Sequence, residues 1–146
     1  MTTAIELSQP IAAPMDRCWR QLSDLASHTT WMKDALAIEF AGSQRQGVGV
    51  AMACKTRIGP FTTNDQMKVV TWDEGTRIGV EHRGIVSGTG LFTLSNSEEG
   101  CLLVWSETLT FPWILGGRIG EAVAKPLMAK IWKGNLVRFA RIVEAA

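Results

Sequence analysis

Four polar residues occupy positions where the pattern of the chain predicts an otherwise apolar surface. Asp65, His82 and Glu107 fall on the inward side of predicted strands, and Asn135 falls on the apolar face of a predicted helix. Imidazole and carboxylate groups serve proteins as general acids and bases, and an unpaired buried carboxylate is costly. Glu107 and His82 are therefore the candidate catalytic residues, or the candidate binders of a ligand's polar end.

Three of these residues also have a structural interpretation. His82 precedes a turn, where its ring would be half exposed. A bulge would turn Glu107 toward solvent, and a lysine or arginine would neutralise it. Asp65 near the sheet edge would pair with Lys55 or Arg57.

A sheet must position these side chains. Apolar and polar residues alternate over residues 4–11, 36–41, 48–57, 61–72, 77–83, 86–94 and 101–111. This alternation is typical of strands with one buried face. Short connections rich in Gly, Pro, Asn and Asp predict antiparallel neighbours.

The turn positions also predict which residues face each other. They set Met67 opposite His82, His82 opposite Gly88, and Gly90 opposite Glu107. Two inward glycines fill no space, so we expect a hollow flanked by His82 and Glu107. These two residues lie two strands apart, roughly 10 Å, too far for a direct hydrogen bond but within reach of a bridging ligand.

The last helix, residues 116–146, is predicted to be interrupted by Pro126. After the proline, Met128, Trp132 and Asn135 lie on one broad apolar face. Asn135 would hold a ligand's polar group or satisfy a neighbouring backbone group. Before the proline, the apolar stripe consists of Ile119, Val123 and Leu127.

The N-terminal region completes an α+β architecture. A strand is followed by a helix that opens at Pro14 and runs to about Asp24, and by a short helix with Ser27 as its N-cap. We expect a curved antiparallel sheet of about seven strands, two short helices after the first strand, and the long C-terminal helix across the concave face.

Bulk properties narrow the function. The chain has 146 residues and a net charge of +1, as expected for one domain spanning residues 1–146 without nucleic-acid affinity. Residues 118–144 carry a local excess of cations, which indicates either a solvated outer face or a helix that lies on a membrane. No signal peptide and no apolar stretch of about 20 residues is visible, so we expect a cytoplasmic protein.

The three cysteines are far apart and show no metal-ligand spacing. They predict neither a disulfide framework nor a zinc site, and Cys54 and Cys101 are expected to be small buried apolar residues. No cofactor and no metal is expected.

Several residues along essentially the whole chain match the pattern of a known superfamily. They are Ala13, Pro14, Trp19, Ser23, Asp24 and Trp31, followed by Gly47, Gly49 and the late Gly100. They resemble the START-like (SRPBCC) superfamily near its polyketide cyclase/dehydrase branch. The resemblance implies the helix-grip (Bet v 1-like) fold, with strand order 1-7-6-5-4-3-2 and a cavity between sheet and last helix. The superfamily includes lipid and hormone carriers and polyketide aromatase/cyclases.

Three functions remain open on the sequence. The first is binding of a hydrophobic or aromatic small molecule, lipid- or polyketide-like, as a monomer or homodimer. The second is a cyclase/dehydrase-type enzyme that uses Glu107 or His82, and the third is a protein- or membrane-interaction domain acting through the basic helix. The expected ligand-binding residues are Trp31, Met52, Asp65, Met67, His82, Gly88, Gly90, Trp105, Glu107, Met128, Trp132 and Asn135.

Overall fold

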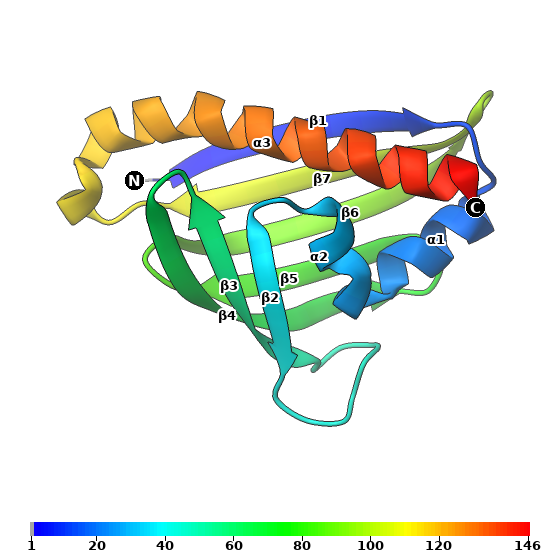
Figure 1. The fold of residues 1–146 in the computed structure, drawn as a ribbon, viewed down its shortest axis with the longest axis horizontal. Coiled ribbons are helices and arrows are strands. Elements are labelled where there is room, and N and C mark those ends of the chain that lie inside the picture. Colours follow the sequence, from blue (N-terminus) through cyan, green and yellow to red (C-terminus); the bar gives the residue numbers. More distant parts are fainter. Residues whose placement is uncertain (1) are drawn as a thin grey trace.

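The computed structural model describes residues 2–146, apart from the side chain of Ile114, and shows one curved sheet gripping a long helix (Figure 1). The strands are β1 (Thr2–Ile11), β2 (Ala35–Phe40), β3 (Ala51–Ile58), β4 (Phe61–Asp73), β5 (Arg77–Arg83), β6 (Ser87–Ser97) and β7 (Gly100–Thr110). The helices are α1 (Met15–Ser23), η1 (Leu25–Ser27), α2 (His28–Trp31), η2 (Trp113–Leu115) and α3 (Gly117–Ala145).

The sheet has the predicted topology. All neighbouring strands are antiparallel, in the order β1-β7-β6-β5-β4-β3-β2. The predicted pairs are confirmed: Met67 faces His82, His82 faces Gly88, and Gly90 faces Glu107. The tight turns and the buried face of each strand both fix this register, since a slip by one residue would turn the buried side chains of a strand toward solvent.

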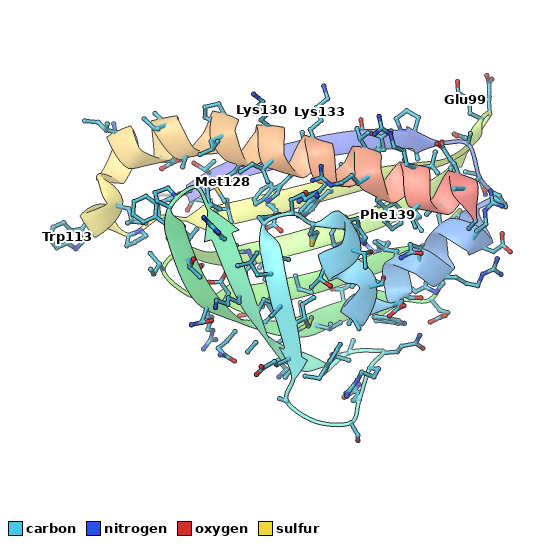
Figure 2. All side chains as sticks on the ribbon, viewed as in Figure 1. Glu99, Trp113, Met128, Lys130, Lys133 and Phe139 are labelled. Carbon is cyan, nitrogen blue, oxygen red and sulfur yellow. A yellow bond between two sulfur atoms is a disulfide. The ribbon has the colours of Figure 1, made fainter. Side chains whose placement is uncertain are left out.

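The long helix crosses the concave side of the sheet beside β1 (Figure 1). The predicted interruption at Pro126 is wrong, since α3 continues through the proline. Pro126 is exposed, and the carbonyl that loses its partner belongs to the exposed Ala122, where water can bind it. Lys130 and Lys133 point away from the sheet (Figure 2) and are exposed, as a solvated outer face requires.

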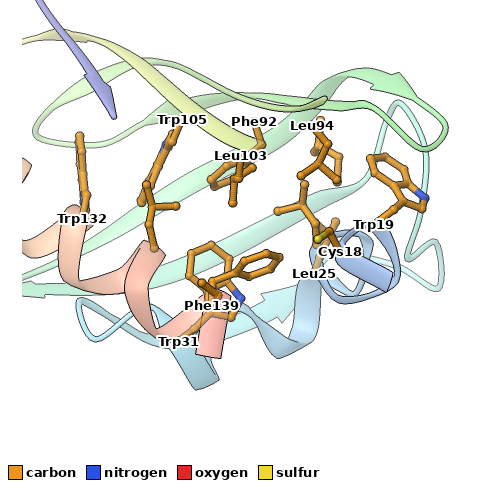
Figure 3. Close-up of a cluster of buried hydrophobic side chains, with 14 of the residues drawn as sticks. Cys18, Trp19, Leu25, Trp31, Phe92, Leu94, Leu103, Trp105, Trp132 and Phe139 are labelled. Carbon is orange, nitrogen blue, oxygen red and sulfur yellow. The ribbon is translucent and has the colours of Figure 1, made fainter. Parts of the chain in front are cut away.

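Aromatic side chains form the centre of the core beneath α3 (Figure 3). Trp105 stacks on Trp132 with ring centroids 5.0 Å apart, and Phe92 lies 5.0 Å from Trp105. Trp31, with no exposed surface, packs edge-on against Phe139 at 5.0 Å. Such tilted and stacked contacts stabilise the core beyond the burial of area alone.

Two local expectations are wrong. The third strand begins at Ala51 rather than at residue 48, because Gly47 and Gly49 adopt positive φ values of 89° and 100° and turn the chain there. Ser27 does not cap α2 with its side chain, since its hydroxyl donates to the carbonyl oxygen of Asp24, 2.7 Å away.

Two of the three cysteines are paired, contrary to expectation. Cys18 on α1 and Cys101 on β7 form a disulfide across 83 residues of sequence, so no local spacing could predict it. Cys54 is free and buried, as expected. Within residues 2–146, no helix combines the length and the apolar character that crossing a membrane requires.

Candidate functional site

A cavity of about 410 Å³ lies between the sheet and the first half of α3. Ligand sites for small molecules commonly measure roughly 300–1,000 Å³ and have mainly apolar walls with a few polar groups. This cavity fits that description, because aliphatic, aromatic and sulfur-containing side chains make up most of its wall. The strands contribute Met52, Met67, Ile78, Val80, Phe92, Trp105 and Leu109, and the helix contributes Ala124, Leu127, Met128 and Trp132.

Four large apolar residues mark the place where the cavity reaches the surface. Phe61, Ile85, Leu115 and Leu127 all line the cavity and remain 72%, 49%, 42% and 46% exposed, respectively. They come from the start of β4, the β5–β6 turn, η2 and α3. An apolar molecule therefore meets apolar side chains along its way into the interior.

The polar centre of the wall is a hydrogen-bonded pair. His82 on β5 and Glu107 on β7 are buried, 9% and 8% exposed, and the imidazole Nε2 lies 3.0 Å from the carboxylate Oε2. The indole Nε1 of Trp105 donates to the other oxygen, Oε1, at 3.0 Å. The predicted separation of roughly 10 Å is wrong for the side chains, which reach toward each other over the intervening strand β6.

Gly90 makes this reach feasible. A Cβ at Gly90 would overlap Oε1 of Glu107, so the carboxylate occupies the volume that a side chain would take. Gly88 is closely approached by the backbone of Thr108 on β7. The predicted hollow over these two glycines is therefore filled, and neither glycine lies in the cavity wall.

The surroundings of His82 act on its pKa in opposite directions. Burial lowers it, whereas the hydrogen bond and charge of Glu107, the charge of Asp65 and a hydrogen bond with the backbone of Val86 raise it. The effects that raise the pKa outweigh burial, and the pKa of His82 is raised above its ordinary value of 6.5. Opposite charge close to a buried imidazole favours its protonated form.

Asp65 lies in the cavity wall on β4, where it does not pair with Lys55 or Arg57. Instead the hydroxyl of Thr56 donates to its Oδ2 at 3.1 Å. Burial raises the pKa of the Asp65 carboxyl, and the Thr56 hydrogen bond and the charge of His82 oppose this rise. The acid is thus half-buried with a single side-chain donor among the described residues.

Asn135 lies fully buried outside the cavity wall. Its Oδ1 accepts from the backbone N–H of Lys33 at 3.0 Å and from Arg138, and its Nδ2 donates to Asp34 at 2.7 Å. Trp132 donates to the same Asp34 carboxylate at 3.1 Å. Of the two roles expected for Asn135, these contacts favour the structural one, in which it anchors the α2–β2 connection to α3.

The structure brings together eight of the twelve expected ligand-binding residues. Those in the wall are Met52, Asp65, Met67, His82, Trp105, Glu107, Met128 and Trp132. Trp31 belongs to the core behind the wall, in contact with Phe92 and Trp105. Asp34 and His28 also line the cavity, although neither was expected there. Nothing in their spacing marks them, because both come from the irregular region around α2.

The described residues offer no metal centre: within residues 2–146, no group of three histidine, cysteine or carboxylate side chains is placed to hold a metal ion. Burial lowers the pKa of His28 to about 4, despite a hydrogen bond with the carbonyl of Leu22 and the charge of Asp24, which raise it. His28 is therefore neutral at pH 7.

Comparison with known proteins places this geometry in a family. Residues 2–144 match the sequence model of the family described as "Polyketide cyclase / dehydrase and lipid transport". The chain belongs to this family. Membership implies a hydrophobic ligand-binding cavity, and the cavity under α3 occupies the corresponding place. No curated protein sequence matches the chain.

Solved structures share the fold at low sequence identity. The protein TTHA0849 from Thermus thermophilus is 19% identical with a TM-score of 0.79, and the match covers 99% of this chain and 98% of that one. The Zhui aromatase/cyclase from Streptomyces sp. R1128 is 14% identical with a TM-score of 0.74, covering 99% and 93%. Ara h 8.0201 is 14% identical with a TM-score of 0.70, covering all of both chains. These likenesses identify the helix-grip, Bet v 1-like fold.

Proposed function

We propose that this protein binds a hydrophobic or aromatic small molecule, lipid- or polyketide-like, in the cavity between the sheet and α3. The observation that carries the proposal is the cavity itself, about 410 Å³, walled by apolar side chains and open through an apolar rim. Burial of apolar ligand surface supplies roughly 25 cal/mol per Å² before the costs of association. Few polar groups are needed for such binding, and the wall has few.

Two alanines of α3 provide a matched test. Ala124 lines the cavity, whereas Ala122, two residues earlier on the same helix, is exposed and lies outside it. Ala124→Phe inserts a ring into the cavity, and Ala122→Phe adds the same ring at the surface. The probe is N-phenyl-1-naphthylamine, an uncharged aromatic amine whose fluorescence rises in apolar surroundings.

We expect the wild-type protein and Ala122→Phe to bind the probe saturably at one site, and Ala124→Phe to lose this binding. Native mass spectrometry followed by denaturing extraction would identify any molecule that co-purifies and is displaced by the probe. Absence of saturable probe binding to the wild-type protein, or equal binding by the two variants, would contradict the proposal.

A second function, acid–base catalysis of the cyclase/dehydrase type, is favoured by one observation. His82 and Glu107 form a buried pair that faces the cavity, and such pairs transfer protons in many enzymes. Glu107→Gln separates the two functions. It would abolish turnover of a candidate polyketide substrate if Glu107 acts as the acid or base, and would only change affinity if the cavity binds without chemistry.

A further inference from the structure

The hydrogen-bonding groups of the cavity wall are unevenly divided between donors and acceptors. The ring N–H donors of the described wall belong to four residues, and each donor already has a protein partner, which for the second nitrogen of His82 is the backbone of Val86. Trp105 and His82 donate to Glu107, Trp132 donates to Asp34, and His28 donates to the carbonyl of Leu22 at 2.7 Å. A ligand that enters finds these donors occupied.

The hydroxyl and thiol donors are mostly occupied as well. Thr56 donates to Asp65, and the thiol of Cys54 lies 3.5 Å from the sulfur of Met67. Burial raises the pKa of the Cys54 thiol to about 12, with the charge of Asp65 as a lesser cause, so this group remains uncharged. Only the hydroxyls of Thr62 and Thr63, at the rim, are uncommitted in the described wall.

Acceptors, by contrast, remain available. A carboxylate offers about four lone-pair sites. Glu107 uses two of them on His82 and Trp105, and Asp65 uses one on Thr56. His28 is neutral and donates through Nε2, which leaves its other ring nitrogen as an acceptor.

The charges of the wall agree with this division. Three carboxylate residues line it, Asp34, Asp65 and Glu107, and among the described lining residues there is no lysine or arginine. His82 is the one wall residue whose surroundings favour a positive charge, since its pKa is raised above 6.5, and it is already paired with Glu107. The interior therefore has an excess of negative charge and of acceptor atoms.

We propose that the cavity selects apolar ligands whose polar end donates hydrogen bonds, such as an alcohol, a phenol or an amine, and rejects carboxylates and phosphates. This inference rests on the proposed binding function and narrows it. A donor end finds free lone pairs on Glu107 and Asp65. A carboxylate end finds no unoccupied ring N–H donor in the described wall and is repelled by the acids, and an unpaired buried charge is strongly unfavourable.

The test uses three competitors that share one naphthalene ring system. Naphthalene-2-methanol is a neutral donor, 2-naphthylmethylammonium is a cationic donor, and 2-naphthoate is an anionic acceptor. Each competes against N-phenyl-1-naphthylamine at pH 7. We expect the alcohol and the ammonium to bind at least about tenfold more tightly than the naphthoate. The two donors each gain a hydrogen bond to a carboxylate of the wall, whereas the naphthoate loses its hydrogen bonds with water and gains none.

Matched variants test the origin of this preference. Asp65→Asn and Glu107→Gln each remove a charge and introduce an N–H donor in the wall, so each should narrow the gap between alcohol and naphthoate. Glu81→Gln is the control, since Glu81 lies outside the wall on the same strand as His82 and pairs with Arg83.

The two proposals fail in different ways. If the fluorescent probe does not bind the wild-type protein saturably, the proposed function fails. If the probe binds, but 2-naphthoate competes as well as the alcohol, the proposed function stands and the preference for donors is wrong. A further outcome is that the difference in affinity between the alcohol and the naphthoate is the same in Asp65→Asn, Glu107→Gln and the control Glu81→Gln. That result would overturn the assignment of the preference to Asp65 and Glu107.

Discussion

The pKa values of the two histidines should be shifted in opposite directions from the ordinary value, and this contrast tests the environment of the site directly. His28 and His82 are the only histidines in the sequence. Burial among aromatic rings lowers the pKa of His28 to about 4, whereas the pKa of His82 is raised above 6.5, because its acidic neighbours outweigh its burial. Each ring reports one side of the cavity.

The shift of His28 predicts an acid-dependent loss of stability. Between pH 6.5 and about 4, the folded protein binds fewer protons at His28 than the unfolded chain, so stability falls as the pH falls. From pH 7.5 to pH 4.5 this residue alone should lower the free energy of unfolding by about 2–3 kcal/mol. His82 has the opposite sign. Its contribution is complete below pH 6.5 and is lost as the pH rises through its folded-state pKa.

The titration is measured by NMR on ring-¹⁵N-labelled protein, in which two histidine signals follow the pH separately. Urea unfolding at pH 7.5 and pH 4.5 then measures the free energies. His28→Gln, which is uncharged at either pH, should lose about 2–3 kcal/mol less on acidification than the wild-type protein. His82→Gln should lose at least as much stability on acidification as the wild-type protein, because His28 remains and the opposing contribution of His82 is removed.

One result would refute this reasoning. If the His28 signal titrates near 6.5, the ring is accessible to water and the wall around α2 is open. Equal losses of stability on acidification in the wild-type protein and His28→Gln would lead to the same conclusion.

Three other sites give predictions that rest on single contacts. Gly90→Ala should destabilise the protein by about 2–3 kcal/mol in urea unfolding, because the new methyl group displaces Glu107 from His82 and Trp105. Gly42→Ala is the control and should be neutral, since nothing lies within 4 Å of its new carbon. Asn135→Ala should cost about 1–3 kcal/mol in thermal unfolding, since it leaves partly buried hydrogen-bond partners unsatisfied. A loss as small as that of the exposed Lys133→Ala would contradict the anchoring role. Cys54, with a pKa of about 12, should resist iodoacetamide at pH 8 in the native protein and react after unfolding, as peptide mass spectrometry would show.

The sheet was predictable because its information is local. Alternation gives the buried face of each strand, and turn chemistry fixes the register between neighbours. Hence the facing pairs Met67–His82 and Gly90–Glu107 follow from the sequence. The position of the terminal atoms of a side chain does not follow from the sequence, because it depends on the rotamer and on the space that the residues of the neighbouring strand leave unfilled.

Gly90 illustrates this limit. An inward glycine indicates missing volume, and from the sequence we expected a ligand to fill that volume. In the structure the carboxylate of Glu107 occupies it, which closes the gap to His82. A glycine between two polar residues on adjacent strands therefore indicates a direct contact as readily as a cavity.

The first half of α3 illustrates a second limit. Periodicity identified Ile119, Val123 and Leu127 as one stripe, but these residues are 78%, 68% and 46% exposed. A repeat shows that residues share a face and not that another element covers it. Here the helix passes over the cavity and its rim rather than over packed core, so Leu127 lines the cavity and the rest of the stripe meets solvent.

The same arrangement bears on the choice between binding and catalysis. Both oxygens of Glu107 already accept hydrogen bonds, from His82 and from Trp105, and its side chain is held over Gly90. A ligand that donates a hydrogen bond can use the remaining lone pairs and leave these contacts intact. Catalysis by Glu107 would instead place a proton on this carboxylate, and loss of its charge would weaken the hydrogen bonds that it accepts from His82 and Trp105. A hydrogen bond to a charged group contributes about 1.5–3 kcal/mol, and binding, which leaves the charge in place, is therefore the function that this geometry favours.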